Sequence, residues 1–147
     1  MNKSILIIIL SGLFSLTCLS IQADPATESL YKRLGGYTAI SAVVDDLAER
    51  LVKNEQLGRF YAHRGIDGIE REKQLTKDFI TAKTGGPLYY TGRNMKLAHE
   101  GMRMSKSDWN IFITLLGETL NKFKVPSQEQ KEVIIFIGSL SNIIVEQ

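Results

Sequence analysis

The residues best suited to chemistry in this 147-residue sequence gather around one histidine, His99. If the segment is helical, Met95 lies four residues before the histidine and Met102 three after it, so the three side chains share one face. A neutral imidazole is a common metal ligand, and two thioethers beside it suit a flat, apolar partner better than water. Lys96 lies at the edge of the same face and offers a positive charge to a carboxylate. We therefore interpret His99 as a candidate iron ligand.

The chain offers few other metal ligands. His63 and His99 are its only histidines, and Cys18 is its only cysteine. These counts exclude a metal centre built from several histidines or cysteines. A single helical histidine, considered alone, is more often an ordinary surface or core residue than a ligand, so the pattern by itself leaves both interpretations open.

Hydrophobic periodicity predicts helices and no strands in the first half of the chain. A turn or two of helix at residues 29–34 should end at Gly35 and Gly36, and Thr38 is expected to cap a long helix that ends at Asn54. A second long helix is expected over residues 69–83, after a turn at 55–61 and a loop at 62–68. The apolar stripe of the first long helix is Ile40, Val43, Val44, Leu47 and Leu51, and one face of the second carries Ile69, Glu72, Thr76, Phe79 and Ile80.

The second half of the chain repeats this helical pattern. Gly85, Gly86 and Pro87 should break the preceding helix, and the short segment with His99 follows. Ser105 or Ser107 can cap a helix whose stripe runs from Trp109 to Phe123, with Ser105 and Asp108 at capping-box spacing. Ser127 and Gln130 predict a second capping box, which opens a last helix with its stripe at Val133, Ile134, Ile137, Leu140 and Ile144. The sum is an all-α domain.

Three separated motifs resemble those of the truncated haemoglobins, specifically of their first group. They are the run 85–92 with Met95 and residues 98–101, the opening motif at residues 30–36, and the helix at residues 39–45. The resemblance extends from Leu30 to the C-terminus. It implies a truncated globin-like fold, a two-over-two helix sandwich around a non-covalently bound haem (iron protoporphyrin IX), with His99 as the proximal iron ligand.

The resemblance also implies which residues surround the haem. It favours haem contact for Phe79, Met95 and Trp109, and Tyr90 matches a tyrosine near the haem edge. Lys96 and Arg93 are candidates for the haem propionates, although a solvated helix face is an equally good interpretation of both. The full set expected around the ring is Phe79, Ile80, Met95, Trp109, Phe112 and Ile137, although periodicity alone fits ordinary core residues as well.

The distal side, opposite the proximal histidine, departs from the family pattern. Ala48 stands where many members place a tyrosine that bonds oxygen, and Glu72 and Thr76 stand where glutamine is frequent. Tyr61 aligns with the aromatic residue over the distal haem face and is the replacement donor that we expect. His63 is either a second axial ligand or, more simply, an exposed loop residue.

The N-terminal segment reads as a secretory signal peptide. Lys3 supplies a positive start, residues 5–16 an apolar core, and residues 21–23 a plausible cleavage site. We therefore expect a signal peptide at 1–23 and a globin domain at 24–147, exported and periplasmic, with no membrane association after cleavage. An uncleaved anchor is the alternative. Lipidation at Cys18 is not expected, because Thr17 is a poor substitute for the small residue that should precede it.

The charge balance gives no sign of a polyanionic partner. Removal of the segment with Lys3 leaves 17 basic residues against 16 acidic ones. Near-neutrality provides no electrostatic footprint for nucleic acid or an anionic membrane, and we expect a monomer.

Three functions are consistent with these features. The first is a haem-binding globin that reversibly binds oxygen or another diatomic gas such as nitric oxide. The second is a haem enzyme with nitric oxide dioxygenase or peroxidase-like activity, which would need a separate reductase because the sequence has no flavin or nucleotide motif. The third is a helical interaction module without its cofactor.

Overall fold

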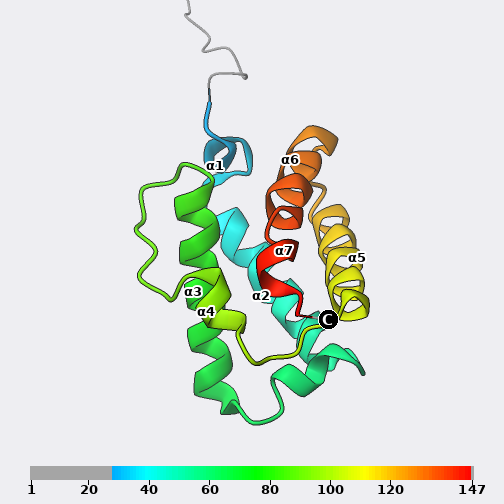
Figure 1. Cartoon of the computed structure of the whole chain (residues 1–147). Helices are drawn as coiled ribbons and strands as arrows, with labels where there is room; N and C mark the ends of the chain where they lie inside the picture. Colours follow the sequence, from blue (N-terminus) through cyan, green and yellow to red (C-terminus); the bar gives the residue numbers. More distant parts are fainter. Residues whose placement is uncertain (1–27, 147) are drawn as a thin grey trace, which may run out of the picture.

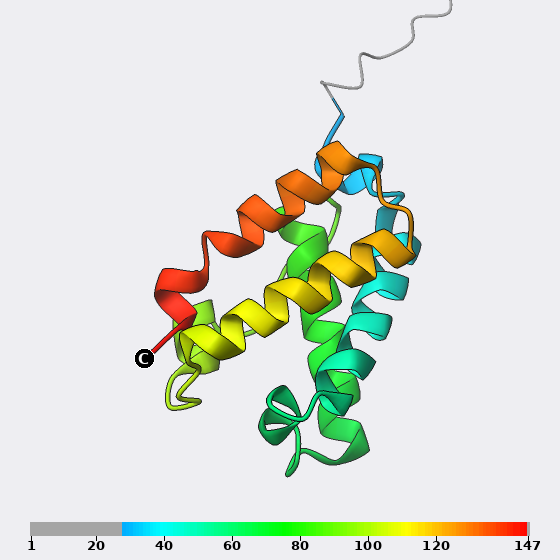
Figure 2. The same cartoon turned by 90° about the vertical axis from the view of Figure 1, so that its right-hand side faces the viewer.

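Two pairs of helices that cross each other form the body of the molecule. The computed structural model describes residues 28–146 (Figure 1). Helix α2 (Gly36–Lys53) packs on α3 (Gly65–Lys83), and α5 (Lys106–Lys122) packs on α6 (Ser127–Gly138). Figure 2 shows α5 and α6 running in opposite directions across α2 and α3. Within the described residues the fold is all-α with the predicted two-over-two arrangement.

Shorter helices lie before, between and after these four. They are α1 (Leu30–Arg33), the 3-10 helix η2 (Leu57–Phe60), α4 (Met95–His99) and α7 (Ser141–Ile144). Among residues 28–146, no helix combines the length and the apolar character needed to cross a membrane. The expected signal peptide lies outside the described residues.

Helix α2 buries its predicted stripe but begins earlier than expected. Ile40, Val44, Leu47 and Leu51 are buried on the side that meets α3 and α5. The prediction of a cap at Thr38 is wrong, because the helix begins at Gly36. Gly35 and Gly36 have φ values of 89° and 75°, which glycine adopts without strain, so the chain turns directly from α1 into α2.

Helix α3 also begins before its predicted start. It starts at Gly65 rather than at residue 69, which shortens the loop that follows η2. Asp67 lies in its first turn, where a negative charge is favoured by the helix dipole.

Only one of the two predicted capping boxes forms. Ser105 and Asp108 form the predicted one at the start of α5. The box at Ser127 and Gln130 is wrong, because the helix already includes Ser127 and its N-cap is Pro126. The Gln130 side chain instead donates to the Val125 carbonyl at 2.8 Å.

The expected single last helix is divided into α6 and α7. The Ser139 hydroxyl donates to the Phe136 carbonyl at 2.7 Å, and this local bond competes with continuation of the helix. Val133 and Ile137 of α6 and Ile144 of α7 are nevertheless buried, as the stripe predicts.

Ion pairs from two neighbouring aspartates of α2 tie the layers together. Asp45 lies 3.0 Å from Lys73 and 2.9 Å from Lys77 of α3, while Asp46 pairs with Arg50 and with Lys122 of α5. Burial alone would raise the pKa of Asp45, but the hydrogen bonds from the two lysines outweigh it and leave that pKa below its usual value. Both aspartates therefore hold α2 against its neighbours as anions.

Candidate functional site

A cavity of about 560 Å3 lies within the helical core. Side chains from α2, α3, α5 and α6 form its wall, and most of them are apolar. Close-packed protein interiors contain few voids larger than a water molecule, whereas ligand pockets typically measure about 300–1,000 Å3. The core is therefore built around space for a ligand.

Helix α4 brings His99 to this cavity. Asn94 caps the helix by accepting a hydrogen bond from the Leu97 amide at 2.9 Å. The Nδ1 atom of His99 lies 2.8 Å from the Met95 carbonyl oxygen, one turn earlier. Because a carbonyl only accepts, Nδ1 carries the proton in this bond. In the neutral imidazole the lone pair is therefore on Nε2, which is the nitrogen available to a metal.

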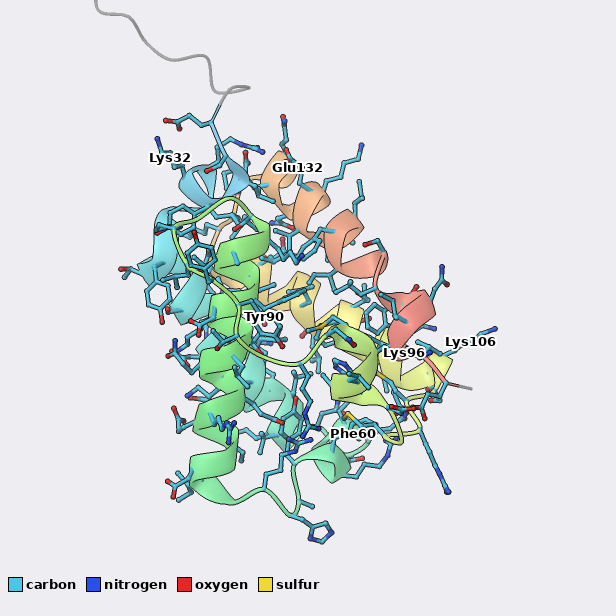
Figure 3. The ribbon with its side chains drawn as sticks, turned by 60° about the vertical axis from the view of Figure 1, so that its left-hand side comes forward. Lys32, Phe60, Tyr90, Lys96, Lys106 and Glu132 are labelled. Carbon is cyan, nitrogen blue, oxygen red and sulfur yellow. The ribbon has the colours of Figure 1, made fainter. Side chains whose placement is uncertain are left out.

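The apolar residues predicted around the ring meet at the same cavity. Phe79 packs edge-on against Tyr90, with ring centres 5.1 Å apart, and Trp109 lies 5.3 Å from Phe112. Figure 3 shows Tyr90 beside α3, in the segment that precedes α4. The Tyr90 hydroxyl is committed, since it donates to the Arg93 carbonyl at 2.8 Å. All of the predicted set lines the cavity: Phe79, Ile80, Met95, Trp109, Phe112 and Ile137, together with Tyr90 and Met102.

Polar side chains occupy one part of the wall, formed by η2 and α3. Tyr61, Arg64, Glu72 and Thr76 all line the cavity there, and Arg64 forms an ion pair with Glu72. The Thr76 hydroxyl donates to the Glu72 backbone carbonyl at 2.9 Å, so its proton is already used. Burial raises the pKa of the Tyr61 hydroxyl, while the charge of Arg64 opposes this effect. A protonated Tyr61 is therefore a hydrogen-bond donor at neutral pH.

Two further positions bear on this polar part of the wall. Ala48 lines the cavity from α2 and has no side-chain donor to offer. His63 is exposed and does not belong to the cavity wall, which agrees with the simpler of its two interpretations.

Comparison with known proteins decides the family. The model of the bacterial-like globin family matches residues 29–145. The chain belongs to this family.

Its relatives place this globin in the first group of truncated haemoglobins. The group 1 truncated haemoglobin of Mycolicibacterium paratuberculosis is 32% identical over 120 residues, which cover 82% of this chain and 85% of that protein. The one from Tetrahymena pyriformis is 33% identical over 98 residues, 67% of this chain and 78% of that protein.

Solved structures agree with this placement. The Fe(III) form of Tetrahymena pyriformis truncated haemoglobin superposes with a TM-score of 0.75 at 25% identity, over 82% of this chain and all of that one. A 2/2 haemoglobin from a Synechococcus species, described with covalently attached haem, gives a TM-score of 0.71 at 28% identity, over 79% and 95% of the two chains.

A globin of this family is a haem protein, and the residues present fit a haem. The cavity supplies apolar surface for the faces of the ring, and His99 supplies an imidazole whose Nδ1 is bonded to the protein and whose Nε2 is left for the iron. Among the other cationic side chains on the wall, Arg33 is paired with Glu129 and Glu132 and Lys73 with Asp45 and Glu70, whereas Lys124 is suited to a propionate. His99, Met95, Phe79 and Trp109 are the residues that would hold the macrocycle.

The two cations expected at the propionates lie elsewhere in this globin. Lys96 does not line the cavity but a surface depression beside Leu97, Glu100 and Ile143, and Figure 3 shows it on α4. Arg93 is exposed and likewise absent from the wall. Propionate contact by either residue stays a prediction.

One residue that the sequence did not reveal, Glu146, supports the His99 segment of this globin. Its carboxylate accepts hydrogen bonds from the backbone amides of Gly101 at 2.7 Å and Arg103 at 2.8 Å. Its own amide donates to the Met104 carbonyl at 2.9 Å. Gly101 and Arg103 have positive φ values of 80° and 53°, so the end of the chain holds a sharply turned loop directly after His99.

A second unforeseen tether holds η2, which precedes Tyr61. The Asp108 carboxylate accepts from Gln56 and from Arg59, each at 2.6 Å, in addition to its capping bonds with Ser105. Its side chain is fully buried, and the hydrogen bond from Arg59 holds the pKa of Asp108 well below its usual range against the opposing effect of burial. Ser105 and Asp108 were predicted as a cap, but no local pattern indicated that the same carboxylate reaches η2.

Proposed function

We propose that this protein is a haem-binding truncated globin that reversibly binds oxygen or another diatomic gas, with His99 as the proximal iron ligand. The observation that carries the proposal is the Nδ1 hydrogen bond from His99 to Met95, on the wall of a large apolar cavity. It selects the tautomer in which Nε2 carries the lone pair and it orients the ring, which is what the second hydrogen bond of a histidine ligand does. Bound ferrous haem supplies the open coordination position at which a gas can bind.

Other residues of the cavity wall would exclude water from the haem and donate a hydrogen bond to the bound gas. The apolar wall excludes water from the ring faces, which favours retention of the ferrous form. Tyr61 can donate a hydrogen bond to a polarised ligand, which the Ala48 position cannot do. Reversible binding needs no electron donor, whereas nitric oxide dioxygenation or peroxide turnover needs a separate reductase, and we therefore place gas binding first.

We further propose that the haem is held non-covalently and that the protein is exported to the periplasm as a monomer. The cavity wall contains one histidine, His99, and no cysteine, so no side chain other than its metal ligand is an obvious site for covalent attachment. The signal-like segment at 1–23 supports export. Acid–acetone extraction that leaves pigment on the protein would contradict the non-covalent form.

Optical spectra of purified wild type, His99→Ala and His63→Ala test the central proposal. With haem supplied during expression, wild type should give ferric, ferrous and carbon monoxide spectra of a histidine-ligated haem. His63→Ala is the matched control, because it removes the other imidazole from an exposed position, and its spectra should equal those of wild type.

His99→Ala should lose the haem, or retain it with an altered axial bond that added imidazole restores. A wild type that stays colourless, or a His99→Ala variant with unchanged spectra, would refute the proposal.

A further inference from the structure

The ion pair between Arg64 and Glu72 is the least expected feature of the cavity wall, and it bears on which ligands the site accepts. Both side chains line the cavity, beside Tyr61. Their side chains remain 37% and 34% exposed, so neither is sealed away from a small molecule that enters the cavity. Any role of this pair in ligand choice presupposes the haem-binding function proposed above.

The guanidinium of Arg64 is only partly engaged by the protein. Its Nε donates to the Phe60 carbonyl at 3.0 Å, and Nη1 faces the Glu72 carboxylate. Within residues 28–146 no hydrogen bond involves its Nη2 group, so two N–H donors of a permanent cation remain unused. The carbonyl bond anchors Arg64 to the end of η2 and thus fixes where those donors lie.

The other polar groups nearby leave Arg64 as the cationic side chain of this part of the wall that still has unused donors. Lys73 also lines the cavity, but its ammonium is shared between Asp45 at 3.0 Å and Glu70 at 2.7 Å. The Thr76 hydroxyl is bonded to a backbone carbonyl. The Tyr61 backbone bonds to Gly58 and Arg64, but its hydroxyl bonds to no other residue among those described and adds one neutral donor.

Such a set of donors favours a negatively charged ligand over a neutral one. A hydrogen bond in which one partner is ionised is roughly twice as strong as a neutral one, and the effect is largest when both partners carry charge. Carbon monoxide, a neutral ligand of ferrous haem, gains little from a guanidinium. A small anion on ferric haem gains a charge-assisted bond, although the charge of Glu72 opposes its entry.

We propose that the polar part of the wall is a subsite for small inorganic anions bound to the ferric haem, with Arg64 as the residue that contacts the anion. Glu72 fixes the arginine beside the cavity and weakens anion binding by its own charge. The pair thereby sets the preference of the site between anionic and neutral ligands.

Titration of the ferric protein with azide and with fluoride, followed by absorbance, tests this inference. Arg64→Gln should raise the Kd for both anions about tenfold to a hundredfold, through the loss of one charge-assisted bond. Arg64→Lys, which keeps the charge and loses the planar fork, should have a smaller effect. Glu72→Gln removes the opposing charge but keeps an acceptor for Arg64, so it should lower the Kd several-fold.

Two controls separate a direct contact from a general change of the cavity. Arg71→Gln removes the same charge from an exposed position of α3, the helix that Arg64 precedes, and should leave the azide Kd within about twofold of wild type. The carbon monoxide affinity of ferrous Arg64→Gln should also change less than about twofold, because that ligand is neutral.

Equal azide Kd values for wild type and Arg64→Gln, when both have the same haem spectrum, would overturn this inference alone. An equal loss of carbon monoxide and azide affinity would overturn it too, since Arg64 would then only shape the cavity. A Glu72→Gln variant that binds azide more weakly would refute the role of the opposing charge. A wild type that never acquires a haem spectrum would refute the proposed function and this inference together.

Discussion

Two sides of the cavity are held in place in different ways. The His99 side consists of α4 and the loop that follows it, and the Tyr61 side consists of η2 and the start of α3. Helix α4 has five residues and buries none of them, and its histidine is oriented by a bond within its own turn. The Tyr61 side is instead fixed by the fully buried Asp108 carboxylate.

Each side nevertheless depends on its own acidic residue, which is distant in sequence from the segment that it holds. Glu146 holds the loop after His99 through two backbone amides, 45 and 43 residues away. Asp108 holds η2 through side chains 49 and 52 residues away. Because Asp108 lies in the interior and Glu146 near the surface, we expect the first to affect the stability of the whole domain and the second to affect haem retention locally.

The largest effect should follow the loss of the Asp108 tether. Asp108→Ala removes the α5 cap and leaves Gln56 and Arg59 without their acceptor, which should lower the free energy of unfolding by about 3 kcal/mol. Urea unfolding followed by circular dichroism measures the change. Asp67→Ala, an exposed aspartate in the first turn of α3, is the matched control and should cost about 0.5 kcal/mol.

The stability lost in Asp108→Ala should depend on pH, because the Asp108 carboxylate titrates differently in the folded and unfolded chains. The pKa of Asp108 in the folded protein lies well below its ordinary value of 3.8, so its contribution is present above that value. The contribution falls as the pH drops through about 5 to 3, where the unfolded chain takes up the proton first. The difference between wild type and Asp108→Ala should therefore shrink over this range, and a constant difference would contradict the assigned role.

An intermediate effect should follow the loss of the Glu146 clamp. Glu146→Ala frees the turned loop after His99, and we expect haem transfer to apomyoglobin to become about tenfold faster, which corresponds to about 1.4 kcal/mol. Glu146→Gln keeps one acceptor oxygen and should have a smaller effect. Resonance Raman spectra should show a shifted or broadened iron–histidine stretch in Glu146→Ala.

Glu100→Ala is the control for this clamp, because it removes an exposed acidic residue at the end of the same helix. It should leave both the transfer rate and the stretch unchanged. Equal haem loss from Glu146→Ala and wild type would show that α4 holds its position without Glu146. Only the Tyr61 side would then depend on a distant acidic residue.

The same comparison explains what could be predicted from the sequence. Helix positions, His99 and the apolar residues around the cavity follow from spacings within one or two turns, or from local family motifs. Periodicity placed the stripe of α2 correctly, while local rules for caps failed at Thr38 and Ser127, where the adjacent Gly35 and Pro126 already define the helix starts.

The tethers could not be predicted because each joins segments more than 40 residues apart. Glu146 is an acidic residue near the chain end, and Arg59 and Gln56 lie in a short turn, so nothing in their local sequence marks them as different from solvated residues. The Arg64–Glu72 pair depends on where α3 begins, and the sequence placed that start four residues too late.

The smallest effect should come from the donor on the Tyr61 side. Tyr61→Phe keeps the aromatic ring on the cavity wall and removes one neutral donor. The oxygen dissociation rate should therefore rise about fivefold, because the lost hydrogen bond contributes about 1 kcal/mol. Stopped-flow displacement of oxygen by carbon monoxide measures this rate.

Tyr90→Phe is the matched control. Tyr90 lines the same cavity, but its hydroxyl is bonded to the Arg93 carbonyl. The oxygen dissociation rate of this variant should therefore stay within about twofold of wild type. An unchanged rate in Tyr61→Phe would remove Tyr61 from the ligand site, and the donors of that side would then reduce to Arg64.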